Sequence, residues 1–378
     1  MTAKFSIDEK IQSYLKNEPE TALKYKKIRK FVTGIYSSGY DISNRCNLVC
    51  EGCLYFDGDG LEKYIDNKEI HEWDTFFKKE KMRGVNYPFI SGAEPSLHKD
   101  RLELANKYWK HGMVFTNGII PLNKDLTFSI HVSVWGDDES DKKLRGANVL
   151  QKIFNNYNND DRVIYVLTIT KQTINQVKNI AHMIWENNGR LTFNHYSPTM
   201  NYNKRLLSNA ENDNKYFRFS NDKDNLRLTQ DDLELSKSIV DELIDENKEK
   251  VVCSHHYNEW ITNPSGIYHI DEKTGFATDC STRNATFHKY YRIDHNEDKS
   301  EKKCCVPFFD CNTCRGYAFS YPTLISRMRR HLNNRKDFLN WVDSFDKWCE
   351  LSFVGWRELS LEEMTREAFW EPVPALRN

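Results

Sequence analysis

Hydrophobic and polar residues alternate at helical intervals through the first part of the chain, residues 6–33. Ser6 and Glu9 have the spacing of a capping box, which marks the start of a helix. Pro19 interrupts the pattern, because proline breaks a helix at interior positions. We therefore expect a helical lead-in over residues 1–35, broken near Pro19, which is too short to form a separate recognition domain.

Short apolar segments then alternate with amphipathic ones. The expected strands are 35–42, 87–91, 111–116, 126–134, 163–170 and 191–196. Amphipathic stretches such as 174–187 separate them and predict helices. Repeated strand-helix units indicate an α/β protein with a parallel sheet. We predict a partial (β/α)6 TIM-type barrel over residues 36–235, with its functional residues at the carboxyl ends of the strands.

The pattern changes beyond the predicted barrel. Residues 201–225 are rich in Asn, Lys, Asp and Arg and predict an exposed connection. A helix is expected over 229–248. Clustered cysteines then indicate a small α+β module over residues 236–320, and residues 321–378 read as a helical tail rich in Trp and Arg.

Charge and hydropathy exclude some functions. Lys and Arg number 54 against 55 Asp and Glu, so the net charge of −1 gives no global attraction to nucleic acid. One basic run is interpreted as a solvated helix face, and it comprises Arg327, Arg329, Arg330, His331 and Arg335. The N-terminus lacks the apolar core of a secretory signal, and no apolar run reaches the roughly 18 residues of a membrane span. We expect a cytoplasmic protein with neither a membrane nor nucleic acid as its partner.

Ten cysteines in a reducing compartment indicate metal ligands or reactive thiols rather than disulfides. Cys46, Cys50 and Cys53 lie close enough in sequence to bind one four-iron cluster and leave its fourth iron open. Spacing alone fits equally well a zinc site with a fourth ligand such as His71 or His98.

Three further segments follow the cysteine triplet, each near the end of an expected strand. They are Ser91-Gly-Ala-Glu-Pro95, Thr116-Asn-Gly118, and Ser133-Val-Trp-Gly136 followed by Asp141 and Arg145-Gly146. With the triplet, these segments resemble in order the motifs of the radical S-adenosylmethionine (SAM) enzymes. The resemblance covers roughly residues 36 to 200 and favours iron over zinc.

The resemblance implies a [4Fe-4S] cluster on the triplet, with SAM bound at the open iron. The residues that it implies for cofactor binding are Tyr55, Gly92, Ala93, Glu94, Asn117, Ser133, Arg145, Thr168 and Asn194. Among them Glu94 suits an ammonium group, Arg145 a carboxylate and Ser133 a ribose hydroxyl. Thr168 and Asn194 lie on late strands, where we expect them, with His195, to line the pocket.

Two positions depart from the family pattern. Most members carry an aromatic residue just before the last cysteine, where this chain has Gly52, so Tyr55 or Phe56 is expected to contact the adenine instead. Ala93 replaces the second glycine of a Gly-Gly-Glu-Pro segment, which puts in doubt only a backbone conformation with positive φ.

A second set of cysteines comprises Cys253, Cys280, Cys311 and Cys314, enough for a closed metal site. Residues 266–280 read as a hairpin that presents Cys280. The region resembles the SPASM and twitch modules of radical SAM enzymes and implies a second, auxiliary [4Fe-4S] cluster, with structural zinc as the alternative. Cys304 or Cys305 could replace Cys253 or Cys280 as a ligand, and Cys349 is expected to be a buried apolar residue.

The sequence leaves several functions open. The first is hydrogen abstraction from a small polar substrate, such as a sugar or another natural-product precursor, followed by oxidation with the auxiliary cluster as electron acceptor. A reductant such as flavodoxin or ferredoxin is the expected protein partner. Alternatives are redox-neutral epimerisation with Cys304 or Cys305 as hydrogen-atom donor, and modification of a peptide or protein side chain. A non-catalytic iron-sulfur or zinc protein is the remaining class.

Overall fold

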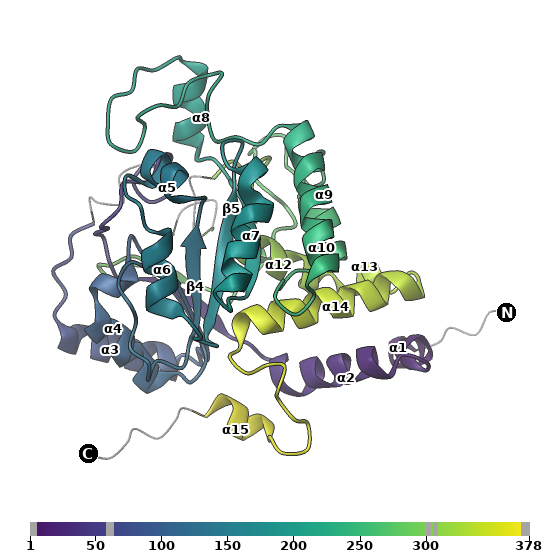
Figure 1. Cartoon of the computed structure of the whole chain (residues 1–378). Helices are drawn as coiled ribbons and strands as arrows, with labels where there is room; N and C mark the ends of the chain where they lie inside the picture. Colours follow the sequence, from purple (N-terminus) through teal and green to yellow (C-terminus); the bar gives the residue numbers. More distant parts are fainter. Residues whose placement is uncertain (1–5, 58–63, 300–303, 305–308, 372–378) are drawn as a thin grey trace.

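A computed structural model of the chain describes residues 6–57, 64–299, 304 and 309–371 (Figure 1). Six strands follow one another as parallel neighbours in sequence order, and a seventh strand extends the sheet beyond β1. The strands are β1 (Ser37–Asp41), β2 (Tyr87–Ser91), β3 (Met113–Thr116), β4 (Ser129–Val134), β5 (Val163–Ile169), β6 (Leu191–His195) and β7 (Tyr290–Tyr291). This order is that of a partial parallel barrel, so the predicted α/β class is confirmed.

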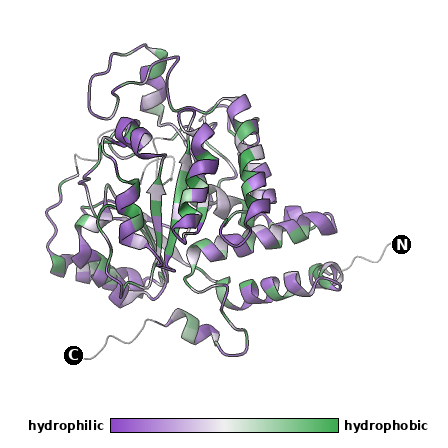
Figure 2. Ribbon diagram, in the orientation of Figure 1, coloured by the Kyte–Doolittle hydropathy of each residue, from purple (hydrophilic) through white to green (hydrophobic). Residues whose placement is uncertain are grey.

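Helices between the strands cover the outer face of the sheet. They are α3 (Ile70–Met82), α4 (Lys99–Tyr108), α5 (Asp138–Arg145), α6 (Leu150–Tyr157) and α7 (Val177–Glu186), with the 3-10 turns η3 (Pro95–Leu97) and η4 (Ile174–Gln176). Figure 2 shows the apolar strands enclosed between helices whose polar faces point outward. This is the arrangement that an amphipathic helix adopts on a buried sheet.

The lead-in forms α1 (Ile7–Leu15), α2 (Pro19–Lys27) and a π turn, η1 (Ile28–Val32). The expected capping box is present, since the Ser6 hydroxyl accepts from the Glu9 backbone and the Glu9 carboxylate accepts from the Ser6 backbone. The break at Pro19 is confirmed. Lys24 on α2 pairs with Asp343 at 2.8 Å, so the lead-in packs against the C-terminal helix α14 (Arg335–Ser352).

Further helices follow β6 along the chain. They are α9 (Gln230–Glu246), α10 (His255–Ile261), α11 (Ser281–Asn284), α12 (Tyr317–Ser326), α13 (Met328–His331) and α15 (Arg366–Trp370). The predicted hairpin has one antiparallel bridge, between Ile270 and Ala277. None of the helices within the described ranges combines the length and apolar character needed to cross a membrane.

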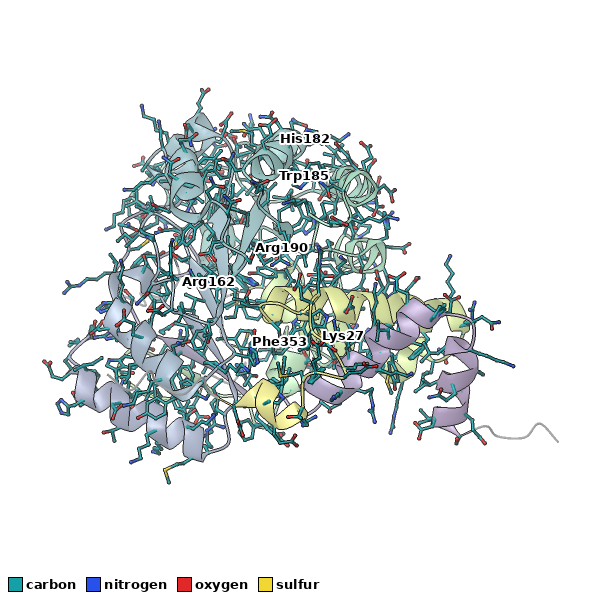
Figure 3. All side chains as sticks on the ribbon, turned by 60° about the horizontal axis from the view of Figure 1, so that its bottom comes forward. Lys27, Arg162, His182, Trp185, Arg190 and Phe353 are labelled. Atoms are coloured by element: carbon teal, nitrogen blue, oxygen red, sulfur yellow. The ribbon has the colours of Figure 1, made fainter. Side chains whose placement is uncertain are left out.

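The C-terminal segment closes one end of the barrel. Tyr87 on β2 donates its hydroxyl to the carbonyl of Ser352 at 2.7 Å, and His131 on β4 binds the carbonyl of Leu351 at 2.9 Å. The other ring nitrogen of His131 lies 2.5 Å from the hydroxyl of Tyr317. Figure 3 views the molecule from below, where Phe353 is labelled. The carboxyl ends of the strands lie at the opposite end of the barrel, toward which the β4 arrow points in Figure 1.

Residues 201–225 are largely exposed, as expected, but they form more than a connection. This stretch contains most of α8 (Met200–Leu207) and a loop, and it buries Tyr202, Leu206 and Phe217 at 2% exposure or less. Because the stretch is polar on average, the sequence did not indicate these few buried apolar residues. They pack with Leu144 and Tyr196 as a small second core. The segment lies over the carboxyl end of the barrel, at the top of Figure 1.

Candidate functional site

The cysteine triplet lies on a tightly turned loop directly after β1. The amide of Cys53 donates to the carbonyl of Cys50 at 3.2 Å, and the amide of Leu48 points at the sulfur of Cys46 at 3.4 Å. All three cysteines are free thiols. Burial raises the pKa of Cys46 to about 11 and also raises that of Cys53, and in both cases the neighbouring thiols of the triplet add to the effect. The loop thus gathers three thiols in one place.

Contacts from residues 201–225, the α8 segment, hold this loop in place. The buried carboxylate of Glu51 accepts from the amides of Arg218 at 2.8 Å and Ser220 at 3.3 Å. Arg205 on α8 pairs with Asp57 at 2.5 Å, just beyond the last cysteine. These contacts were not predicted from the sequence, although the acidic residues on either side of Cys53, Glu51 and Asp57, were the available signal.

The loop leaves no room for a side chain at Gly52. Its φ is +57°, and an added Cβ would lie 2.2 Å from the hydroxyl of Tyr196. That hydroxyl donates to the Gly52 carbonyl at 3.0 Å. An aromatic residue at position 52 is therefore incompatible with this loop, because Tyr196, from the end of β6, fills the space.

Tyr55 and Phe56, the expected adenine contacts, lie at the end of the same loop. Tyr55 is buried, and its hydroxyl donates to the carbonyl of Ser43 at 3.1 Å. Phe56 stacks on Tyr216, with ring centroids 4.7 Å apart. Both rings thus have protein partners, and the adenine contact stays a prediction.

Glu94 and Asn117 join the ends of β2 and β3 to the triplet. The Glu94 carboxylate accepts from the hydroxyl of Thr116 and from the amide of Asn117, both at 2.7 Å. The side-chain amide of Asn117 in turn lies 3.7 Å from the sulfur of Cys46 and donates to Asn47 at 2.7 Å. Glu94 therefore positions Asn117, and Asn117 offers an N–H to the first cysteine.

The turn after β2 passes very close to the backbone after β1. Gly92 has φ of +114°, and an added Cβ would lie 2.5 Å from the carbonyl oxygen of Ser43. The next amide, of Ala93, donates to that same carbonyl at 2.8 Å. Positive φ is needed at Gly92, and Ala93 is not among the described residues with positive φ, so alanine is accommodated there.

Arg145 connects the third segment with the second cysteine. It is 1% exposed, donates to the carbonyl of Ser133 at 3.0 Å and lies 3.5 Å from Asp141. Burial raises the pKa of the Cys50 thiol, and the charge of Arg145 and its hydrogen bond to the sulfur oppose that rise. The Ser133 hydroxyl accepts from Trp135 at 3.2 Å.

The late-strand residues lie on paired positions of β5 and β6. Thr168 is the register partner of Asn194, whose side-chain oxygen accepts from the amide of Tyr317 at 3.3 Å. His195 is buried and lies 2.8 Å from the hydroxyl of Ser236 on α9. Burial lowers the pKa of His195 to about 3, so the ring is neutral.

A buried polar cluster beside the loop was not predicted. Asp41, the last residue of β1, accepts from Ser91 at 3.2 Å and from the hydroxyl of Tyr290 on β7. Arg292 also pairs with Asp41, at 3.2 Å. The position of Asp41 at a strand end was the available signal, whereas nothing in the sequence indicated that Tyr290 pairs with β1.

The structure groups the later cysteines differently from the first-choice set. Burial raises the pKa of Cys314, and Cys304, Cys280 and Cys311 all add to this rise. Cys253 is also buried, but the groups that act on its thiol are Tyr321, Lys347, Asp241 and Ser254. The charge interactions thus connect Cys304, rather than Cys253, with Cys280, Cys311 and Cys314. Cys305 lies outside the described residues. Cys349 is fully buried, as expected.

The surroundings of the triplet fit an iron-sulfur cluster. Asn117 and Arg145 direct N–H groups at sulfurs of the triplet, and such donors stabilise thiolate ligands of a cluster. In the described part of the chain, no three His, Cys, Asp or Glu side chains are close enough together to hold a single metal ion.

Comparison with known proteins gives structural likeness only. No protein-family model matches the chain, and no curated protein matches it. Among solved structures, Streptococcus suis SuiB bound to S-adenosylmethionine is 16% identical, with a TM-score of 0.48 over 78% of this chain and 66% of that one. Native anSMEcpe with bound AdoMet is 14% identical, with a TM-score of 0.46 over 69% of this chain and 73% of that one.

A third structure, HydG, a maturase of the [FeFe]-hydrogenase, is 10% identical, with a TM-score of 0.35 over 62% of this chain and 55% of that one. The chain spans slightly less than two thirds of the length of the SAM-bound SuiB chain. The site is therefore interpreted from its own residues.

Proposed function

We propose that this chain is a radical SAM enzyme that abstracts a hydrogen atom from a small polar substrate. The observation that carries the proposal is the meeting of Cys46, Cys50 and Cys53 with Asn117 and Arg145 at the carboxyl end of the barrel. When bound there, a [4Fe-4S] cluster with an open iron supplies the electron that cleaves SAM to methionine and a 5′-deoxyadenosyl radical.

The chain's own residues position this chemistry. Gly92 and Ala93 place backbone groups beside the triplet, and Glu94 acts through Asn117. Ser133 and Arg145 are the proposed contacts of SAM on β4 and α5, and Thr168 and Asn194 are the proposed lining on β5 and β6.

The proposed outcome is a two-electron oxidation. The deoxyadenosyl radical takes a hydrogen atom from the substrate, and the substrate radical then loses a proton and one electron. A second cluster on Cys280, Cys304, Cys311 and Cys314 is the proposed electron acceptor. A flavodoxin or ferredoxin is the proposed electron donor for SAM cleavage. Using Cys304 as a ligand removes it as a hydrogen-atom donor, which weakens the epimerisation alternative.

One surface feature supports a peptide substrate as the second candidate. An open groove runs along α8 beside the second cysteine set, lined by Met200, Asn203, Lys204, Leu207, Ser208 and Asp310. Leu207 is 78% exposed and Met200 49%. An open groove that exposes two large apolar side chains suits an extended chain better than a small polar molecule.

Anaerobic reconstitution tests the proposal. About eight irons per chain and dithionite-dependent formation of 5′-deoxyadenosine are expected. The variant C46A/C50A/C53A is expected to lose about half the iron and all SAM cleavage. Cys349→Ala is the matched control, because this buried cysteine belongs to neither set and should leave both readouts intact. Stoichiometric zinc, or SAM cleavage by the triple variant, would contradict the proposal.

A further inference from the structure

Arg315 lies between the second cysteine set and the barrel. It directly follows Cys314, and its amide donates to the hydroxyl of Ser197, just beyond β6, at 2.8 Å. Its side chain is almost fully buried, with 6% exposure. The residue is thus held in the interior, directly next in the chain to a proposed ligand.

The charge of Arg315 is not compensated in the described part of the chain. One terminal nitrogen donates to the carbonyl of Asn263 at 2.7 Å, whereas the other is buried and has no hydrogen-bond partner. No ion pair formed by the described residues includes Arg315. A buried charge without a counter-ion is costly, so such a group normally faces an anion.

Two other arginines beside cysteines differ in this respect. Arg327, near Cys280, pairs with Asp279 at 2.6 Å, and Arg145, near Cys50, pairs with Asp141. Arg315 directly follows Cys314 in the chain, so the thiolates of the cysteine set are the adjacent source of the negative charge that its unpaired nitrogen lacks.

We propose that Arg315 is the counter-charge of the second cluster and raises its reduction potential. This inference rests on the proposed function, which places a cluster on Cys280, Cys304, Cys311 and Cys314. A cluster held by four thiolates is anionic and gains one more negative charge when it takes up an electron. A buried positive charge with a free N–H stabilises the reduced form more than the oxidised form.

The test isolates the second cluster in the full-length variant C46A/C50A/C53A. After anaerobic reconstitution, its midpoint potential is measured by a dye-mediated dithionite titration followed by electron paramagnetic resonance. Adding Arg315→Gln is expected to shift the one-electron equilibrium at least tenfold toward the oxidised form, which is 59 mV. Arg315→Lys keeps the charge and should shift it less.

Arg190→Gln is the matched control. Arg190 precedes the opposite end of β6, where it donates to the carbonyl of Asp161 at 2.9 Å (Figure 3). Its replacement should leave the potential unchanged.

The outcomes separate the inference from the function on which it rests. Absence of iron from the background variant would overturn both the second cluster and the role of Arg315. A bound cluster whose potential is the same with Arg315 and with Gln would overturn only this inference. Loss of the cluster with both Gln and Lys would also overturn it, because the effect would then be structural. Loss with Gln alone would support it.

Discussion

The amide of Arg218 donates to the buried carboxylate of Glu51 at 2.8 Å, joining the α8 segment to the cysteine loop across 167 positions of sequence. This contact makes a distant polar segment part of the proposed cluster site. We predict that Glu51→Gln leaves one backbone donor unsatisfied and lowers the free energy of unfolding by about 1 to 3 kcal/mol. Iron bound by the triplet should fall with it, as measured by iron analysis and chemical denaturation. Glu211→Gln, an exposed change in the same segment, should alter neither quantity.

Gly52 provides a second test of the loop. Gly52→Ala should prevent the loop from closing against Tyr196, because the new Cβ would lie 2.2 Å from the hydroxyl of that residue. Gly355→Ala is a matched control for backbone strain, since Gly355 has φ of +72° and no atom within 4 Å of the added Cβ. Both variants carry the cost of positive φ, roughly 1 kcal/mol. Only Gly52→Ala should also lose reconstituted iron, and equal losses would count against this role of the loop.

Glu94 gives a prediction about SAM. In Glu94→Gln, at least one of the three donors, which are Ser96, Thr116 and Asn117, would face an amide nitrogen instead of a carboxylate oxygen. The lost hydrogen bond should cost about 1 to 3 kcal/mol of stability. If Glu94 acts only by positioning Asn117, Asn117→Ala should weaken SAM binding to a similar extent, measured by calorimetry on reconstituted protein. Weaker binding in the Glu94 variant alone would indicate direct contact with SAM.

His131 makes stability depend on pH. Burial lowers its folded-state pKa to about 4, below the unfolded value of about 6.5. Between these values the unfolded chain binds a proton that the folded chain excludes, so stability falls as the pH falls. From pH 7 to pH 5 this histidine should remove about 2 kcal/mol from the free energy of unfolding.

The measurement is urea denaturation at both pH values. His131→Gln keeps a donor for the Leu351 carbonyl and should reduce the loss between pH 7 and pH 5 by that amount. His182→Gln, on the exposed side of α7, is the control for replacing a histidine at the surface. An unchanged pH dependence in the His131 variant would contradict the prediction.

Local patterns predicted the elements well. The strand at 87–91 was placed without error, and the capping box of Ser6 and Glu9 was found, because both depend on neighbouring residues. The two-residue strand β7 was missed, since its pairing with β1 is set by contacts about 250 positions apart and leaves no periodic pattern.

Site residues were predictable where a motif fixes them and not where packing does. Asn117 lies beside Cys46, near the loop to which the motifs pointed, while its contact with SAM stays a prediction. The grouping of Cys304 with the later cysteines depends on how the chain folds back, which spacing cannot give. The anchoring role of residues 201–225 depends on a few buried aromatic residues within a stretch that is otherwise largely exposed, so average composition predicted the exposure but not the anchoring.

The closed end of the barrel also has a consequence for how the protein is made. Tyr87 hydrogen-bonds to Ser352, which the ribosome adds 265 residues later. At a translation rate of about 5 to 20 residues per second, Ser352 is added roughly 13 to 50 s after Tyr87 on β2. During that time the C-terminal segment does not yet cover the end of the barrel, and the apolar lining of the barrel is exposed to other chains. The emerging protein is therefore expected to depend on chaperones until the last long helix has left the ribosome.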